Sequence, residues 1–163
     1  MTDDTLNQMG QYLIWSEKKL IEMIEKIPVE KFEEENAIFG RSIKDLANHI
    51  WLSYKGYFLG FGSEEYGNLE KQSRDLSKND LFKIWLAATE EFATAIAKEK
   101  DIYEYPISDD KKVEINMISN IMQYTDHSTY HRGQLIVQIK TSGFEVSSTD
   151  YYLFLEEFLK DKN

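Results

Sequence analysis

The sequence predicts an all-α protein, and three of its features lead to that fold class. Four long stretches carry apolar residues at the spacing of an amphipathic helix. The segments between them hold both prolines and four of the eight glycines, which are typical of turns and loops. The strand-like alternation of apolar and polar residues occurs in one short region only. These features favour a four-helix bundle with a long crossover loop and a short fifth helix at its C-terminal end.

The first helix is expected over about residues 4–27. Its apolar residues recur at nearly helical spacing and would form one buried face: Leu6, Met9, Leu13, Leu20, Met23, Ile24 and Ile27. Pro28 ends this helix, because proline lacks the backbone N–H and its ring clashes with the preceding turn. A charged connector, residues 29–36, follows.

The second helix is expected over residues 43–59, with Ser42 as its N-cap. Asp45 stands three residues after Ser42, which is close to a capping-box arrangement. Residues 60–78 then contain Gly60, Gly62, Gly67 and many charged side chains. We expect this segment to be the longest loop of the protein.

The third helix is expected over about residues 80–98, capped by Ser77 or Asn79. Its buried stripe would consist of Leu81, Ile84, Trp85, Ala88, Phe92, Ala95 and Ile96. Residues 102–105 and 112–115 alternate with a period of two around residues 108–110. This pattern favours a short hairpin or an extended connector, with too little strand to build a sheet.

The fourth helix is expected over about residues 117–141, between an N-cap at Asn116 and a left-handed C-cap at Gly143. Gly133 lies in its middle at a cost near 1 kcal/mol relative to alanine. A close helix crossing at that point is the favoured reason, and room beside a bound group is the alternative. A last amphipathic segment, residues 149–159, would pack back on the other helices and form the short fifth helix.

Composition narrows the classes of function. The length of 163 residues suits one domain, and no repeat or change of composition divides the chain, so we expect a single domain over residues 1–163. The net charge of −10 disfavours nucleic acid and anionic membrane surfaces as partners. Since the acidic N-terminus lacks the features of a signal peptide and no apolar run could span a membrane, the expected location is cytoplasmic. Without any cysteine, thiolate ligands and a cysteine nucleophile are excluded.

Two of the three histidines, His127 and His131, stand four residues apart inside the fourth predicted helix. Side chains at this spacing share one face, with Cβ atoms about 5–6 Å apart, so both rings could bind one ion. Taken alone, such a pair is more often a solvated surface feature or two hydrogen-bonded core histidines than a metal site. A helical bundle completes a metal site with a ligand from a facing helix, and His49 in the second helix is the one imidazole left.

The sequence around this pair resembles the fourth-helix signature of the DinB/YfiT family. That signature is a histidine, three residues, His-Arg-Gly-Gln and an apolar stretch, followed by a glycine and later an aspartate that opens the last helix. Here these are His127, residues 131–134, Gly143 and Asp150. Residues 43–50, which contain His49, resemble the family's second-helix segment with the first ligand. The resemblance thus extends over essentially the whole chain.

The resemblance implies an antiparallel four-helix bundle, often a homodimer, with a three-histidine site formed here by His49, His127 and His131. It implies one divalent ion, with zinc or nickel expected first and iron or manganese as alternatives. Imidazole ligands alone do not choose among such metals, and three of them leave a position open for water or substrate. By helical reach, we expect Asp45, Gln123 and Gln134 as hydrogen-bond acceptors for the ligand rings. Arg132 points away from the site and is expected in a structural salt bridge or an interface.

Three functions remain open at this stage. The first is a metal-dependent enzyme acting on small molecules, either a hydrolase or a thiol S-transferase of the kind that the resemblance implies. The thiol S-transferase would use an external low-molecular-weight thiol. The second function is a non-catalytic, stress-associated metal-binding protein, and the third is a scaffold with a vestigial site. The catalytic residues are not identifiable from the sequence.

Overall fold

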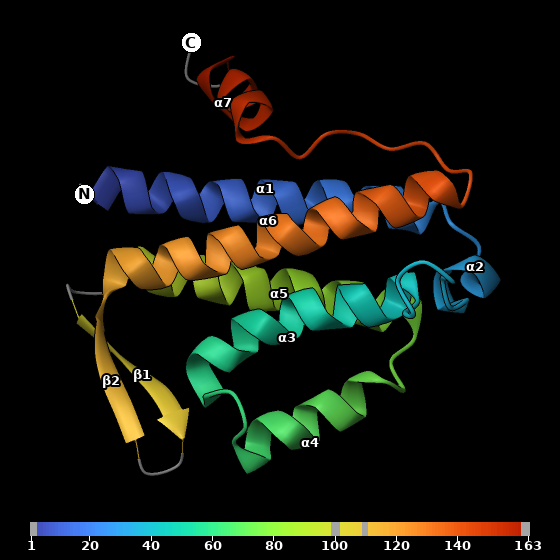
Figure 1. Ribbon diagram of the computed structural model, residues 1–163. Coiled ribbons are helices and arrows are strands. Elements are labelled where there is room, and N and C mark those ends of the chain that lie inside the picture. The colour runs from blue at the N-terminus through green and yellow to red at the C-terminus, as the bar shows by residue number, and fades with distance from the viewer. Residues whose placement is uncertain (1–2, 99–101, 109–110, 161–163) are drawn as a thin grey trace.

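Four long helices form the body of the protein (Figure 1). The computed structural model describes residues 3–98, 102–108 and 111–160. The long helices are α1 (Asp3–Glu25), α3 (Ile43–Leu59), α5 (Lys78–Ile96) and α6 (Met117–Thr141). Helix α1 packs against α5, α5 against α3, and α3 against α6. Apart from one hairpin, the described part of the chain is all-α, as the sequence predicts.

The long helices do not all alternate in direction. In Figure 1, α1 and α6 run one way while α3 and α5 run the other. The contacting pairs α1/α5 and α3/α6 are therefore antiparallel, whereas α3 and α5 are parallel neighbours. The long connection between α3 and α5 makes this parallel pairing possible, because it returns the chain to the end where α3 began.

That connection is not the loop expected over residues 60–78, because it contains α4 (Glu64–Ser73). The Oγ of Ser63 caps this helix by accepting from the N–H of Tyr66 at 3.1 Å, and two glutamates in the first turn suit the helix dipole. Tyr66 and Leu69 pack against the core. The sequence prediction was wrong here, because this helix depends on its cap and on packing of these two side chains against the core, which outweigh the glycines.

The charged connector after α1 also contains a helix, α2 (Val29–Glu33), which begins directly after Pro28. Proline suits a helix start because the N–H that it lacks has no partner there. Phe32 of α2 is fully buried. Its ring packs against Phe82 of α5, and the ion pair between Glu33 and Lys44 joins α2 to α3. The charged residues around Phe32 concealed this helix in the sequence.

Strands β1 (Ile102–Ser108) and β2 (Lys111–Asn116) pair as an antiparallel two-stranded sheet. The hairpin was expected, but it does form a small sheet, contrary to the prediction that it would not. Register runs from Ile102 opposite Asn116 to Ser108 opposite Lys111, with an irregularity near Pro106. Residues 109 and 110, where the turn was expected, lie outside the described residues.

Helix caps fix the starts of the two helices that carry histidines. Ser42 and Asp45 form both halves of a capping box before α3: Ser42 Oγ accepts from the Asp45 N–H at 3.0 Å, and Ser42 N–H donates to the Asp45 carboxylate at 2.9 Å. Asn116 caps α6 by accepting from the N–H of Ile118 at 2.8 Å. Gly143 follows α6 with a φ of 89°, the left-handed conformation predicted for it.

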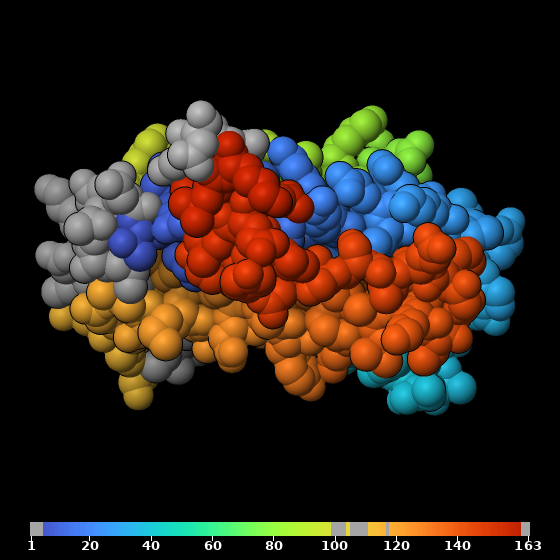
Figure 2. All heavy atoms as spheres, turned by 90° about the horizontal axis from the view of Figure 1, so that it is seen from above, coloured from blue at the N-terminus to red at the C-terminus, as the bar shows by residue number. Residues whose placement is uncertain are grey.

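The core lies between the long helices and is rich in aromatic residues. Trp51 and Tyr54 of α3 and Trp85 and Phe92 of α5 are fully buried. The last helix, α7 (Tyr151–Lys160), lies across α1 after an extended segment that follows α6 (Figure 2). None of the described helices is long and apolar enough to cross a bilayer.

Candidate metal centre

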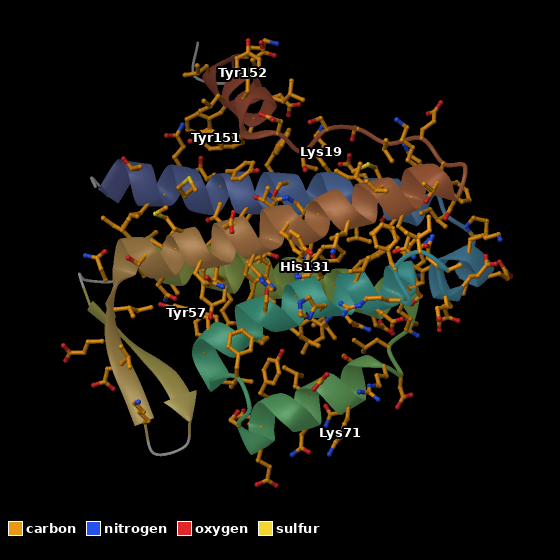
Figure 3. All side chains as sticks on the ribbon, viewed as in Figure 1. Lys19, Tyr57, Lys71, His131, Tyr151 and Tyr152 are labelled. Carbon is orange, nitrogen blue, oxygen red and sulfur yellow. The ribbon has the colours of Figure 1, made fainter. Side chains whose placement is uncertain are left out.

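The three histidines meet between α3 and α6. His49 comes from α3, while His127 and His131 stand one turn apart on α6, and Figure 3 shows His131 between the two helices. One ring nitrogen of each histidine lies within 4.8 Å of the corresponding nitrogens of the other two. The structure thus brings together the three side chains that the sequence proposes as ligands.

The spacing of the ring nitrogens suits one shared divalent ion. The Nε2 atoms of His49 and His131 are 3.1 Å apart. Two nitrogen ligands bound tetrahedrally at about 2.0–2.1 Å from an ion would lie about 3.3 Å from each other. Two nitrogen lone pairs facing each other at such a distance repel, so a proton or a cation must lie between them. Three imidazoles leave room in the coordination sphere for water or a substrate.

Gln134 orients the ring of His131. Its Oε1 lies 2.8 Å from Nδ1 of His131. Because an amide oxygen can only accept, Nδ1 carries the proton and Nε2 keeps its lone pair on the side of the other two histidines. A hydrogen bond of this kind to the outer ring nitrogen is the usual support of a histidine ligand.

The histidines are neutral at pH 7. The pKa of His49 is lowered from 6.5 to about 4, mainly by burial and then by repulsion between the protonated ring and its neighbours His131, His127 and Arg41. Burial also lowers the pKa of His127 and of His131. Since metals bind the neutral imidazole, the rings are already in the protonation state that a ligand needs.

The other two expected acceptors are placed differently. In the described part of the chain, neither Asp45 nor Gln123 hydrogen-bonds a histidine ring. The Asp45 carboxylate accepts from the N–H and the hydroxyl of Ser42, at 2.9 Å and 2.7 Å, and so serves the cap of α3. Gln123 lies beside His127 at the edge of a hollow. Helical reach alone could not anticipate that a nearby cap would take the Asp45 side chain.

The comparison with known proteins agrees with the family resemblance of the histidine segments. Residues 1–161 match the model of the DinB family. The chain belongs to the DinB family. One relative, Protein DinB of Bacillus subtilis (strain 168), is 22% identical over 165 residues, which cover 91% of this chain and 92% of that protein. Both matches include α3 and α6, so the resemblance drawn from the histidine segments is confirmed.

Behind the histidines of this DinB-family chain lies a buried ion pair. Nη1 of Arg132 is 3.3 Å from Oε1 of Glu17, and both side chains are fully buried. Burial disfavours the charged guanidinium and is the largest single influence, but Glu17, Tyr12 and Tyr54 together more than offset it, so the pKa of Arg132 is raised. The sequence predicts a salt bridge for Arg132, but it gives no sign of the partner on α1.

The same carboxylate gathers two hydroxyl groups from the histidine-bearing helices. Tyr54 of α3 and Ser128 of α6 both donate to Oε1 of Glu17, at 2.9 Å and 2.6 Å. Ser128 is the neighbour of His127 in the sequence. The network therefore joins α1, α3 and α6 just behind the site and fixes how α6 is set against α3.

Two hollows border the histidines of this DinB-family chain, and they differ in chemistry. The hollow beside His127 has a volume of about 250 Å³ and is lined by Ser53, Phe61, Gln123, Tyr124 and His127. The hollow beside His49 is larger, about 450 Å³, and mostly polar. It is lined by Gly40, Arg41, Asp45, Asn48, His49, Leu52, Tyr66, Glu70, Ser73 and Arg74. A group bound at the histidines could thus be approached by two different molecules.

Proposed function

We propose that this chain holds one divalent ion with His49, His127 and His131 and transfers an external small thiol to an electrophilic small molecule. The convergence of three neutral imidazoles from two helices carries the proposal. The described part of the chain is mostly helical, and two of its long helices, α3 and α6, carry the three proposed ligands. Zinc or nickel suits this all-nitrogen donor set, although iron(II) binds imidazole as well.

The two hollows favour a transferase over a hydrolase. A hydrolase needs one organic substrate besides water, whereas a transferase needs room for two. A polar hollow meets the histidines at His49, and a second hollow with two aromatic walls, Phe61 and Tyr124, meets them at His127. This pairing suits a polar thiol on one side and a more apolar electrophile on the other.

A bound divalent ion would lower the pKa of a thiol or water that coordinates to it. In the transfer, the thiol gives its proton to solvent, its sulfur forms a bond to the electrophilic carbon, and the leaving group departs with the bonding electrons. Because the chain has no cysteine, the thiol must come from outside. The role of the chain is to hold the three rings neutral and oriented, as Gln134 does for His131.

Metal content measured by plasma mass spectrometry tests the first half of the proposal. The protein should be prepared without a histidine tag, because the chain itself has only three histidines. We expect close to one ion per chain in the wild type and almost none in the double variant His127→Ala/His131→Ala. Tyr130→Phe is the matched control, since it changes an exposed ring beside His131 and removes no nitrogen ligand.

Turnover tests the second half. We expect conjugation of simple thiols with an alkylating electrophile to depend on the bound ion and to be lost in His49→Ala. Metal binding without any turnover would instead support a non-catalytic metal-binding protein. Turnover that is unchanged in His49→Ala would exclude catalysis at this centre, and circular dichroism would show whether each variant is folded.

A further inference from the structure

Two arginines line the hollow beside His49. The whole chain has only three arginines, and Arg132 is used in the buried pair with Glu17. The other two, Arg41 and Arg74, come from different parts of the chain, one just before α3 and the other at the end of α4. Both border the same hollow as His49. Every arginine outside the buried network is therefore at the candidate site.

Within the part of the chain that the structure describes, neither guanidinium has a partner of its own. Among the described residues, the side chains of Arg41 and Arg74 form no hydrogen bond or ion pair, and both are exposed. Two carboxylates share the hollow, Asp45 and Glu70. The Asp45 carboxylate is occupied by two hydrogen bonds from Ser42. The arginines thus remain available to a bound molecule.

The hollow is distinct from the rest of the surface in its charge. The chain carries a net charge of −10, so most of its surface repels anions. In the hollow, two arginines balance two carboxylates, and an ion held by the histidines would make the hollow positive. Arg41 is close enough for its charge to contribute to the lowered pKa of both His49 and His131. An anion at Arg41 would thus lie next to the histidines.

We infer that the hollow binds an anionic group on one substrate and that Arg41 and Arg74 recognise it. The planar guanidinium, with its fork of N–H donors, matches carboxylates and tetrahedral oxyanions. The inference rests on the proposed function, because it assigns the anionic group to the thiol substrate whose sulfur reaches the centre. The other substrate then occupies the hollow with Phe61 and Tyr124 beside His127.

Three thiols of similar length provide the test: 3-mercaptopropionate, 2-mercaptoethanesulfonate and neutral 2-mercaptoethanol. The tag-free protein is loaded with cobalt(II), and changes in the visible absorption of the ion give the dissociation constant of each thiol. The variants are Arg41→Gln, Arg74→Gln and the double variant. Lys71→Gln is the matched control, since it removes one positive charge from α4 at a position outside the hollow (Figure 3).

We expect the double variant to bind the anionic thiols about tenfold more weakly, with little change for 2-mercaptoethanol and no change in cobalt content. Lys71→Gln should behave as the wild type. A stronger loss for 3-mercaptopropionate would assign the hollow to carboxylates, and a stronger loss for 2-mercaptoethanesulfonate to tetrahedral anions. Equal effects on charged and neutral thiols, or no effect of either arginine, would overturn the inference. If the wild type binds no cobalt, the proposed function fails first, and the two failures are distinguishable.

Discussion

Glu17 and Arg132 form a fully buried ion pair, with Oε1 and Nη1 3.3 Å apart, although 115 residues separate them in the sequence. Such a pair contributes little net stability, because both charges lose their hydration. Its role here is to fix the positions of the helices around it. The Glu17 carboxylate also accepts from Tyr54 and Ser128, so one group on α1 sets the two helices that carry the histidines.

Removing one partner should destabilise the protein strongly. Arg132→Met leaves the Glu17 carboxylate buried without its counter-ion, and we expect a loss of about 3–5 kcal/mol in the free energy of unfolding. Glu17→Gln in the same chain should recover part of that loss, because the amide oxygen still accepts from Tyr54 and Ser128 without a charge. Urea unfolding of the wild type, both single variants and the double variant measures this coupling. Strictly additive losses would show that the two charges act independently.

Gln134 should matter for metal affinity more than for folding. Gln134→Leu removes the acceptor at Nδ1 of His131, and we expect metal affinity to fall about 10–100-fold, as is usual for such supporting residues. Gln134→Glu keeps an acceptor at the same place and should keep the affinity. Competition with a chromophoric zinc chelator measures both variants. A Gln134→Glu protein as weak as Gln134→Leu would mean that the hydrogen bond is not the cause.

Gly133 was expected to mark a close helix crossing, and this prediction was wrong. A Cβ atom at Gly133 would meet nothing within 4 Å, and the residue is exposed. Gly133→Ala should therefore stabilise the protein by about 1 kcal/mol, the difference in helix propensity. Gly10→Ala is the contrast, since its Cβ would lie 3.0 Å from Cβ of Ala93 on α5. Thermal unfolding should show a gain for the first variant and a loss for the second.

The features that the sequence predicted correctly are those that depend on residues close together in the chain. The long helices, the Ser42 and Asn116 caps and the turn at Gly143 follow from apolar spacing and cap chemistry within a few residues. The sequence did not predict the short helices that depend on contacts with residues far away in the chain. Helices α2 and α4 each rely on a few apolar side chains packed against α3 or the core, which no local pattern reveals.

The residues of the candidate site fall into the same two groups, those that local spacing predicts and those that depend on helix packing. Spacing placed His127 and His131 on one face. His49 was the one imidazole left on a facing helix, and the family resemblance supported it. The hydrogen bond between His131 and Gln134 follows from helical reach, because it spans three residues. The Glu17 partner and the two arginines beside His49 could not be predicted, since each depends on how separate helices pack.

The metal-free protein should lose stability as the pH falls below 6.5. The pKa of each histidine is lower in the folded protein than the ordinary value of 6.5, and that of His49 is about 4. Between these values the unfolded chain takes up protons that the folded protein does not, so acid favours unfolding. We expect the melting temperature to fall from pH 6.5 to pH 5, a range that lies above the ordinary pKa of carboxylates. His49→Gln should show a shallower decline over this range, because it removes the histidine with the pKa of about 4. An identical decline in wild type and variant would show that other groups cause the acid sensitivity.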